Sequence, residues 1–379
     1  MFANNEKISL RQLRAALILD WTGKLFLLLP ILLQPLSGRE KIGALLIGIP
    51  AAVVYGAVVG DVAGRIRGTF TGYVRERMGK PAAGTVGILF FLYLLLNLVY
   101  LAQAVGELCR VFLLPECRPA VIGFSYLLAG LAAAGGSVQK RVRAAECLFP
   151  IVVLMLILML AAAAGSVEGS RFLAAESCRP GEVIRRSSCV FAAFSGMGVV
   201  LYQVPYINAG KQMNGISGQR KGMTGAIQGA VLGTGALLLA VFAVMLGAFG
   251  AADLSRLEWP VPVLMSNVNL PGEFLQRWDV IFLSVLMMSL LMASGTGIYY
   301  MSRILGELFP KVEEEGLLKY SVGIAAVVLL ISGNYQTMER LYARWAFCAV
   351  MPFLTAFPVL LWVLERVKKG WAGIKRKSD

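Results

Sequence analysis

The 379-residue sequence contains no histidine. Histidine is the commonest metal ligand and the usual proton carrier near neutral pH. A histidine-bound zinc, a Ser-His-Asp triad and a histidine proton relay are therefore excluded. The six cysteines form no C-x-x-C pair. The sequence also lacks a G-x-x-x-x-G-K-[ST] phosphate loop and a G-x-G-x-x-G turn. We expect neither an ATP-driven pump nor an enzyme of a familiar soluble type, and no cofactor or metal.

Charge is also scarce. Only 15% of the residues are charged and 58% are hydrophobic, whereas soluble domains carry about 25% charged residues. The mean hydropathy is +0.71, and apolar stretches of about 20 residues, long enough to cross a bilayer as helices, recur along the chain. Lipid cannot satisfy exposed backbone groups, so such stretches must be helical. The sequence predicts an all-α polytopic membrane protein in a lipid bilayer.

Hydropathy predicts ten transmembrane helices within a single transmembrane domain covering residues 1–379. The first is not expected to be a cleaved signal peptide, because it lacks an A-x-A-like site and polar residues interrupt its apolar core. The ten predicted spans are 8–36, 42–62, 84–114, 119–135, 146–165, 187–208, 224–249, 279–301, 317–333 and 343–365.

The distribution of basic residues predicts the orientation of the chain in the membrane. Most of the 36 Lys and Arg residues fall in segments that are cytoplasmic if the N-terminus is inside. We therefore expect both termini to be cytoplasmic. The formal charge of +14 is then mainly a topological signal. Its positive residues are scattered over many short loops, so we expect no nucleic-acid partner.

The sequence also predicts features of two segments outside the apolar spans and of the cysteines. Residues 63–83 mix basic and apolar side chains, as expected for either a short helix on the cytoplasmic face or a solvated loop. The external stretch 250–278 is long for a simple connection and is expected to form a cap. The cysteines are expected to pack as small apolar side chains. Cys178 and Cys189 could meet externally as a disulfide, but nothing in their spacing demands it.

The first span contains two opposite charges near its middle. LILDWTGKLFLLLP, residues 17–30, places Asp20 and Lys24 four residues apart, with Thr22 and Gly23 between them. Charges at membrane depth persist mainly where they face a partner or a watery cavity. On an unbroken helix the two side chains share a face and could neutralise each other. Alternatively, Gly23 weakens the helix, and a break would expose backbone groups that bind a substrate, as in discontinuous transporter helices.

A matching break is expected in the sixth span, AFSGMGVVLYQVP, residues 193–205. It carries Ser195, Gly196, Met197 and Gly198 in succession. Ten spans that divide five and five place the two halves in opposite orientation, which is the inverted-repeat plan. The predicted repeats cover about 8–165 and 187–365, with helices 1 and 6 discontinuous.

The third span presents a polar face. Tyr93, Asn97, Tyr100 and Glu107 are spaced so that they lie along one side of a helix. Packing against neighbouring helices would account for the tyrosines. An amide facing lipid is harder to accommodate, so Asn97 and Tyr100 are expected to contact a ligand or unwound backbone. Glu107 lies nearer the external end, where water could solvate it.

Several stretches resemble the spore germination permeases, the B subunits of nutrient germinant receptors in endospore-forming bacteria. KISLRQL (7–13), followed by Gly23 and Pro30, resembles that family's first span. WPVPVLMSNVNLPGEFLQRWD (259–279) resembles its pattern before the eighth span, and FPVLLWVLERVKK (357–369) fits its C-terminal end. The residues that match the pattern before the eighth span are Phe274, Leu275, Arg277 and Asp279.

The resemblance implies a LeuT-type fold of the amino-acid–polyamine–organocation superfamily. It also implies a subunit that binds a small-molecule germinant, commonly an amino acid, in the spore inner membrane or the cytoplasmic membrane. Its expected partners are an A-type membrane subunit and a C-type lipoprotein subunit. Two positions depart from the family pattern. Family members usually carry uncharged residues at Asp20 and Lys24, and usually a glutamate where this chain has Gly198.

Two other functions need the same fold. One is a secondary transporter of amino acids or amines, coupled to protons through Asp20 or Glu107. The other is a scaffold subunit that binds no ligand. The substrate-binding residues expected from the sequence are Asp20, Thr22, Gly23, Lys24, Asn97, Tyr100, Ser195, Gly196, Met197 and Gly198.

Overall fold

A computed structural model describes residues 7–33, 36–173, 179–207, 216–266, 278–309, 312–342, 344–345 and 350–378. Across these ranges the chain is helical, and its one isolated β-bridge joins Ile8 and Ile207 in parallel. The helices are α1 (Leu10–Leu32), α2 (Gly38–Ala63), α3 (Phe70–Met78), α4 (Lys80–Phe112), α5 (Pro119–Ala134), α6 (Val138–Ala164), α7 (Gly169–Leu173), α8 (Pro180–Ser195), the 3-10 helix η1 (Gly196–Tyr206), α9 (Ile216–Leu254), α10 (Pro260–Ser266), α11 (Trp278–Leu308), α12 (Glu314–Ile331), α13 (Tyr335–Leu341) and α14 (Met351–Ser378).

Each of the ten predicted spans overlaps a helix. Within the described ranges, six are long and apolar enough to cross a membrane, counting α8 and η1 as one, and the bent pair α12–α13 would make seven. These helices make the chain an integral membrane protein, and the full count of ten spans stays a prediction.

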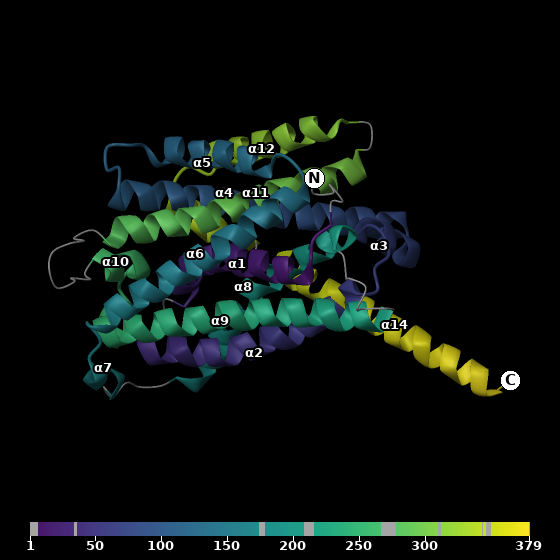
Figure 1. The fold of residues 1–379 in the computed structure, drawn as a ribbon, viewed down its shortest axis with the longest axis horizontal. Coiled ribbons are helices and arrows are strands. Elements are labelled where there is room, and N and C mark those ends of the chain that lie inside the picture. Colours follow the sequence, from purple (N-terminus) through teal and green to yellow (C-terminus); the bar gives the residue numbers. More distant parts are fainter. Residues whose placement is uncertain are drawn as a thin grey trace.

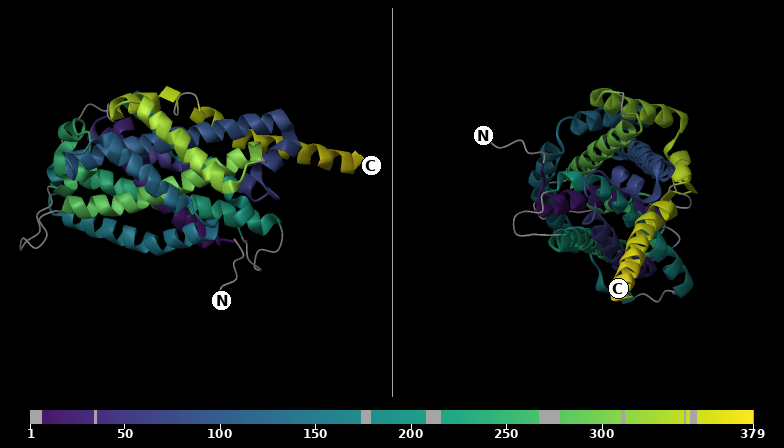
Figure 2. Two further views of the ribbon diagram at one scale, coloured as in Figure 1. Left: turned by 90° about the horizontal axis from the view of Figure 1, so that it is seen from above. Right: turned by 90° about the vertical axis from the view of Figure 1, so that its right-hand side faces the viewer.

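The helices form a layered bundle around α1 (Figure 1). Helix α1 packs against α9 on one side and α11 on the other, and it also contacts α6. Helices α2 and α9 pair along one edge, while α4, α5, α11 and α12 form the layers at the opposite edge. The C-terminal part of α14 projects away from the bundle (Figure 2).

The order of elements recurs in the second half. A short helix, α3 or α10, separates the second and third long helices of each half. The limits of the two repeats, 8–165 and 187–365, stay predictions. Helix α3 shows that 63–83 contains a helix, which begins at Thr69, whose hydroxyl accepts the Gly72 N–H at 3.2 Å. Its Phe70 packs against Phe90 and Tyr202.

Part of the predicted external cap is present. Helix α9 turns at Gly250, where a φ of 75° favours glycine, and α10 buries Val261 and Leu264 in the core. Residues 267–277, which hold Phe274, Leu275 and Arg277, lie outside the described residues, and so does Cys178. The disulfide with Cys189 therefore stays a prediction.

Helix α1 is continuous, so the predicted break at Thr22–Lys24 is wrong. The Thr22 hydroxyl donates to the Ile18 carbonyl at 2.6 Å, one turn back in an intact helix. Gly23 instead permits close packing: a Cβ there would lie 2.8 Å from Ser289 Oγ on α11. The Ser289 hydroxyl donates to the Leu19 carbonyl, which fixes the two helices together.

The sixth span does change at the predicted residues. The α-helix ends at Ser195, and an 11-residue 3-10 helix follows from Gly196. Runs of 3-10 helix longer than three or four residues are uncommon and often mark a hinge or strain. A Cβ at Gly196 would lie 2.1 Å from the Tyr93 hydroxyl oxygen. The glycine therefore lets α4 approach the point where the helix type changes.

A network of ion pairs joins helices α2, α9 and α14. Asp61, near the end of α2, pairs with Arg65 and with Arg220 on α9. Arg65 also pairs with Glu365 on α14. Because these side chains are largely buried, the network fixes α14 against α2 and α9 where α14 leaves the bundle.

Replacing Gly23 with alanine tests the packing role. The added Cβ would clash with Ser289, so we expect Gly23→Ala to lower the free energy of unfolding by about 1–3 kcal/mol. Thermal unfolding of the purified protein in detergent measures this. Gly84→Ala in α4 is the matched control: its Cβ meets no atom within 4 Å, and alanine is the better helix former. Equal stability of the two variants would contradict the close contact with α11.

Candidate functional site

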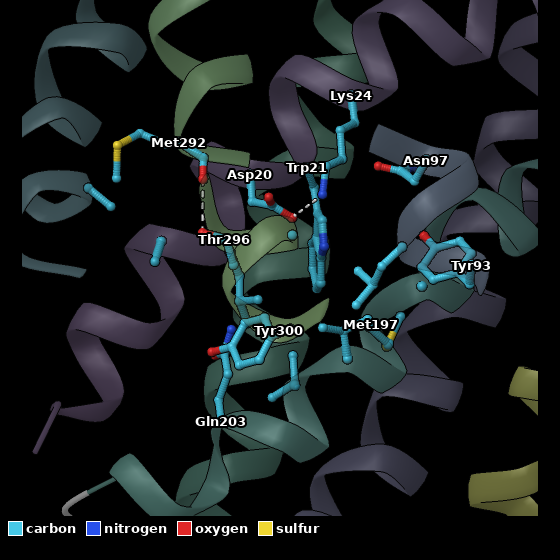
Figure 3. Close-up of a pocket in the computed structure, with 18 of the residues that line it drawn as sticks. Asp20, Trp21, Lys24, Tyr93, Asn97, Met197, Gln203, Met292, Thr296 and Tyr300 are labelled. Atoms are coloured by element: carbon cyan, nitrogen blue, oxygen red, sulfur yellow. Dashed lines mark hydrogen bonds and ion pairs between the residues drawn. The ribbon is translucent and has the colours of Figure 1, made fainter. Parts of the chain in front are cut away.

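A cavity lies in the centre of the bundle between α1, α4, α6, η1 and α11 (Figure 3). The centre of a water molecule can reach about 70 Å³ of it. One water needs roughly 10–15 Å³ on this measure, so the cavity suits a few waters or a small ligand. Its polar and aromatic lining consists of Asp20, Trp21, Lys24, Tyr93, Asn97, Arg141, Gln203, Thr296, Tyr300 and Tyr342.

The two charges of α1 meet inside this cavity. Lys24 Nζ donates to Asp20 Oδ2 at 2.8 Å, as i,i+4 neighbours of an intact helix. Their side chains are 19% and 17% exposed, respectively. Asp20 Oδ1 is buried and makes no hydrogen bond. The ion pair therefore leaves one carboxylate oxygen available to a further donor.

Asn97 belongs to the wall of the cavity. Its Nδ2 donates to the Tyr342 hydroxyl at 2.9 Å, and both residues line the space. Tyr100 does not line it; its ring stacks on Tyr342 with centroids 4.6 Å apart. Tyr335 and Trp259 continue this aromatic cluster, with centroids 5.4 Å apart. Tyr100 therefore supports the wall from behind, and its predicted ligand contact is not seen.

The sixth span contributes two of its four predicted residues, Gly196 and Met197. Gly198 lies outside the lining, where a Cβ would meet the Phe90 ring at 3.3 Å. The side chain of Ser195 falls outside the described residues.

Of the predicted α1 residues, Asp20 and Lys24 line the cavity, whereas Thr22 and Gly23 do not. The reason is the continuous helix, which directs Thr22 into its own backbone and sets Gly23 against α11. Glu107 also lies outside the lining, and its carboxylate pairs with Arg110, with Nε to Oε2 at 3.2 Å.

The most informative residue missed in the sequence is Arg141. It lies in the first turn of α6, which begins after the Ser137 cap, and only 7% of it is exposed. Its sequence neighbours Lys140 and Arg143 are also basic, so the sequence indicates only a basic segment on the cytoplasmic side of the membrane. Nothing in this cluster of basic residues after the Ser137 cap indicates that one of them is buried. Only the packing of α6 against α1 and α11 brings Arg141 into the cavity.

Gln203, Thr296 and Tyr300 were missed as well. Figure 3 shows Gln203 and Tyr300 side by side toward one end of the cavity, away from Asn97. The sequence signal for Gln203 is a side-chain amide within an apolar span. The same pattern predicts a ligand contact at Asn97.

Two solved structures share the fold. Mhp1, a nucleobase-cation-symport-1 family transporter in a closed conformation with bromovinylhydantoin bound, aligns with a TM-score of 0.67. That alignment covers 92% of this chain and 77% of Mhp1, at 13% identity. MhsT in complex with L-phenylalanine aligns with a TM-score of 0.64, covering 91% of this chain and 88% of MhsT, also at 13% identity. At this identity the likeness establishes the fold alone, which is LeuT-type.

Curated relatives cover most of the chain. Spore germination protein B2 of Bacillus subtilis (strain 168) is 23% identical over 322 residues, which is 79% of this chain and 83% of the relative. Spore germination protein YndE of the same organism is 22% identical, with 86% and 87% covered. Spore germination protein GerLB of Bacillus cereus is 21% identical, with 82% and 80% covered. All three relatives are named as spore germination proteins, and Mhp1 is described as a transporter.

The sequence profile described as "Spore germination protein" matches residues 40–338, which is most of the chain. The match includes α2, α4, α6, η1 and α11, and therefore most of the helices that enclose the cavity. The chain belongs to the spore germination protein family of membrane permeases and germinant-receptor subunits.

Proposed function

We propose that this protein is a B-type germinant-receptor subunit that binds a small nutrient, an amino acid, in the central cavity and signals spore germination. The observation that carries the proposal is the central cavity holding the Asp20–Lys24 pair with one unsatisfied carboxylate oxygen. A buried acceptor without a donor costs free energy. The ammonium group of an amino acid would supply that donor with a charge-assisted hydrogen bond.

The remainder of the lining suits a small organic molecule. Trp21, Met197 and Tyr300 present apolar and aromatic surface around the charged pair. Ligand sites are commonly apolar with a few placed polar groups that fix orientation. The two solved neighbours are likewise complexes with a small molecule, and one of those molecules is L-phenylalanine.

The proposal extends to partners and location. An A-type membrane subunit and a C-type lipoprotein subunit would complete the receptor in the spore inner membrane. The basic segments support cytoplasmic termini. The projecting end of α14, which carries several Lys and Arg residues, would then extend into the cytoplasm.

A second candidate is proton-coupled transport of amino acids or amines, favoured by the fold shared with Mhp1, which is a transporter. Asp20 would be the proton carrier, because Glu107 is paired with Arg110 away from the cavity. Uptake of radiolabelled L-amino acids by proteoliposomes under a proton gradient separates the two functions. A transporter accumulates label only with the gradient, whereas a receptor binds without accumulation.

Removing both members of the ion pair tests the ligand site. Each single change, Asp20→Asn or Lys24→Met, leaves an uncompensated charge, so we expect lower protein abundance. The double variant restores charge balance and is expected to accumulate normally, while germination in response to the twenty standard L-amino acids is lost. The readouts are membrane abundance by immunoblot and the fall in optical density of spores.

The matched control is the double variant Glu107→Gln with Arg110→Met, which removes an i,i+3 ion pair from α4 outside the cavity. It should leave the germination response unchanged. A normal response in the Asp20→Asn, Lys24→Met double variant would make that pair structural and remove both residues from the site.

Asn97→Leu tests the wall of the cavity. The substitution removes the hydrogen bond from Asn97 to the Tyr342 hydroxyl, and we expect the germinant concentration giving a half-maximal response to rise about tenfold. Gln103→Leu is the control on the same helix. Gln103 is a buried amide bonded to Leu329 O and Ser332 Oγ but lies outside the lining. It should lower thermal stability without changing apparent affinity. Equal affinity in the Asn97 variant and wild type would make this face structural.

A further inference from the structure

The cavity contains a buried cation that has no acidic partner among the described residues. Arg141 Nη1 donates to two backbone carbonyls, Ala134 O at 2.6 Å and Gly136 O at 3.3 Å. Its guanidinium carbon lies 3.7 Å from the centroid of the Tyr299 ring. These contacts hold the side chain in place but do not neutralise its charge. A buried charge without a counter-ion is unfavourable.

One nitrogen of the same guanidinium is unused. Arg141 Nη2 is buried and makes no hydrogen bond, although Arg141 lines the cavity. Buried donors in native proteins nearly always have a partner, so an unsatisfied one calls for an explanation. A guanidinium is a strong donor to carboxylates. An anionic group in the cavity would satisfy both the nitrogen and the charge.

The positive charge at this position is reinforced by a second guanidinium. Arg303 Nε donates to the Tyr299 hydroxyl at 2.8 Å, and its guanidinium carbon lies 5.1 Å from the same ring centroid. Two cations therefore contact one tyrosine beside the cavity, and only Arg141 lines the space. Arg141 therefore shares the Tyr299 ring with a second guanidinium rather than with a carboxylate.

Lys24 and the backbone of α1, the two carboxylate sites expected from the sequence, are engaged. Lys24 is bound to Asp20 at 2.8 Å. The backbone amides around Gly23 belong to the interior of a continuous helix, so they form no half-helix N-terminus that could bind an anion. Arg141 thus remains as the cation of the lining that lacks a carboxylate.

We propose that Arg141 binds the carboxylate of the ligand, while Asp20 Oδ1 accepts from its ammonium group. The ligand is then a small amphoteric molecule of the α-amino-acid class, and Lys24 serves as the standing counter-ion of Asp20. This inference rests on the proposed function, because it names the chemistry of the ligand in that cavity. It assigns the anion site to α6 rather than to α1.

The test compares acids with their neutral amides. The purified full-length chain in lipid nanodiscs is screened by thermal shift against the twenty standard L-amino acids, and those that stabilise it are titrated by calorimetry. Each is then compared with its α-carboxamide, which keeps the ammonium and loses the negative charge. For the wild type we expect the acid to bind at least about tenfold more tightly than the amide.

Arg141→Gln should weaken binding of the acid by at least about tenfold and bring acid and amide to similar affinity. The acid-to-amide ratio is measured within one protein, so a general loss of stability leaves it unchanged. Arg143→Gln removes one charge from an exposed position two residues along the same helix, and its ratio should equal that of the wild type. If the Arg141→Gln protein does not accumulate, Arg141→Lys is tested instead. Its acid-to-amide affinity ratio is expected to be at least about threefold lower than that of the wild type.

The outcomes separate the two proposals. An unchanged ratio in the Arg141 variants, or equal binding of acid and amide by the wild type, would overturn the role of Arg141 and leave a ligand-binding cavity in place. If no amino acid stabilises the wild type, ligand binding in the cavity fails, and the role of Arg141 fails with it.

Discussion

A charge inside a membrane must find its partner within the protein, and this requirement organises the centre of the bundle. Asp20 and Lys24 could not face lipid singly, so α1 stays helical between them and holds them as an i,i+4 pair. The intact helix keeps its backbone groups satisfied where no water is available. The consequence is that side chains, rather than opened backbone, supply the polarity of the cavity.

The two halves meet this requirement differently. The first span remains α-helical through its glycine because Ser289 of α11 closes against it. The sixth span changes to 3-10 helix at Gly196, where Tyr93 of α4 comes closest. The tighter 3-10 winding rotates the following residues relative to an α-helix. It thereby places Met197 and Gln203 on the cavity, while Gly198 packs against Phe90.

The sequence predicts some parts of this arrangement and not others, because residue types differ in how clearly they indicate their structural role. Hydropathy locates the long helices, because a bilayer demands about 20 apolar residues whatever the neighbours are. Asp20, Lys24 and Asn97 are recognisable because polar groups in apolar spans need partners. A glycine does not show whether it serves unwinding or close packing, since that depends on the helix opposite; Gly23 illustrates this. Arg141 could not be recognised because its burial arises only when α6 packs across α1 and α11.

The position of Arg141 also places the cavity beside a junction of three elements. Two residues earlier on α6, Gln139 donates to the Lys7 carbonyl at 3.3 Å. The neighbouring Ile8 N–H donates to the Tyr206 carbonyl of η1 at 2.7 Å. The start of α6, the N-terminal segment and the end of η1 are thus joined by one side-chain and one backbone hydrogen bond. Arg141 is itself bonded to Ala134 O and Gly136 O in the turn before α6, so the proposed anion site lies next to the junction of these elements. The 3-10 helix is the element of the three with the weakest hydrogen-bond geometry.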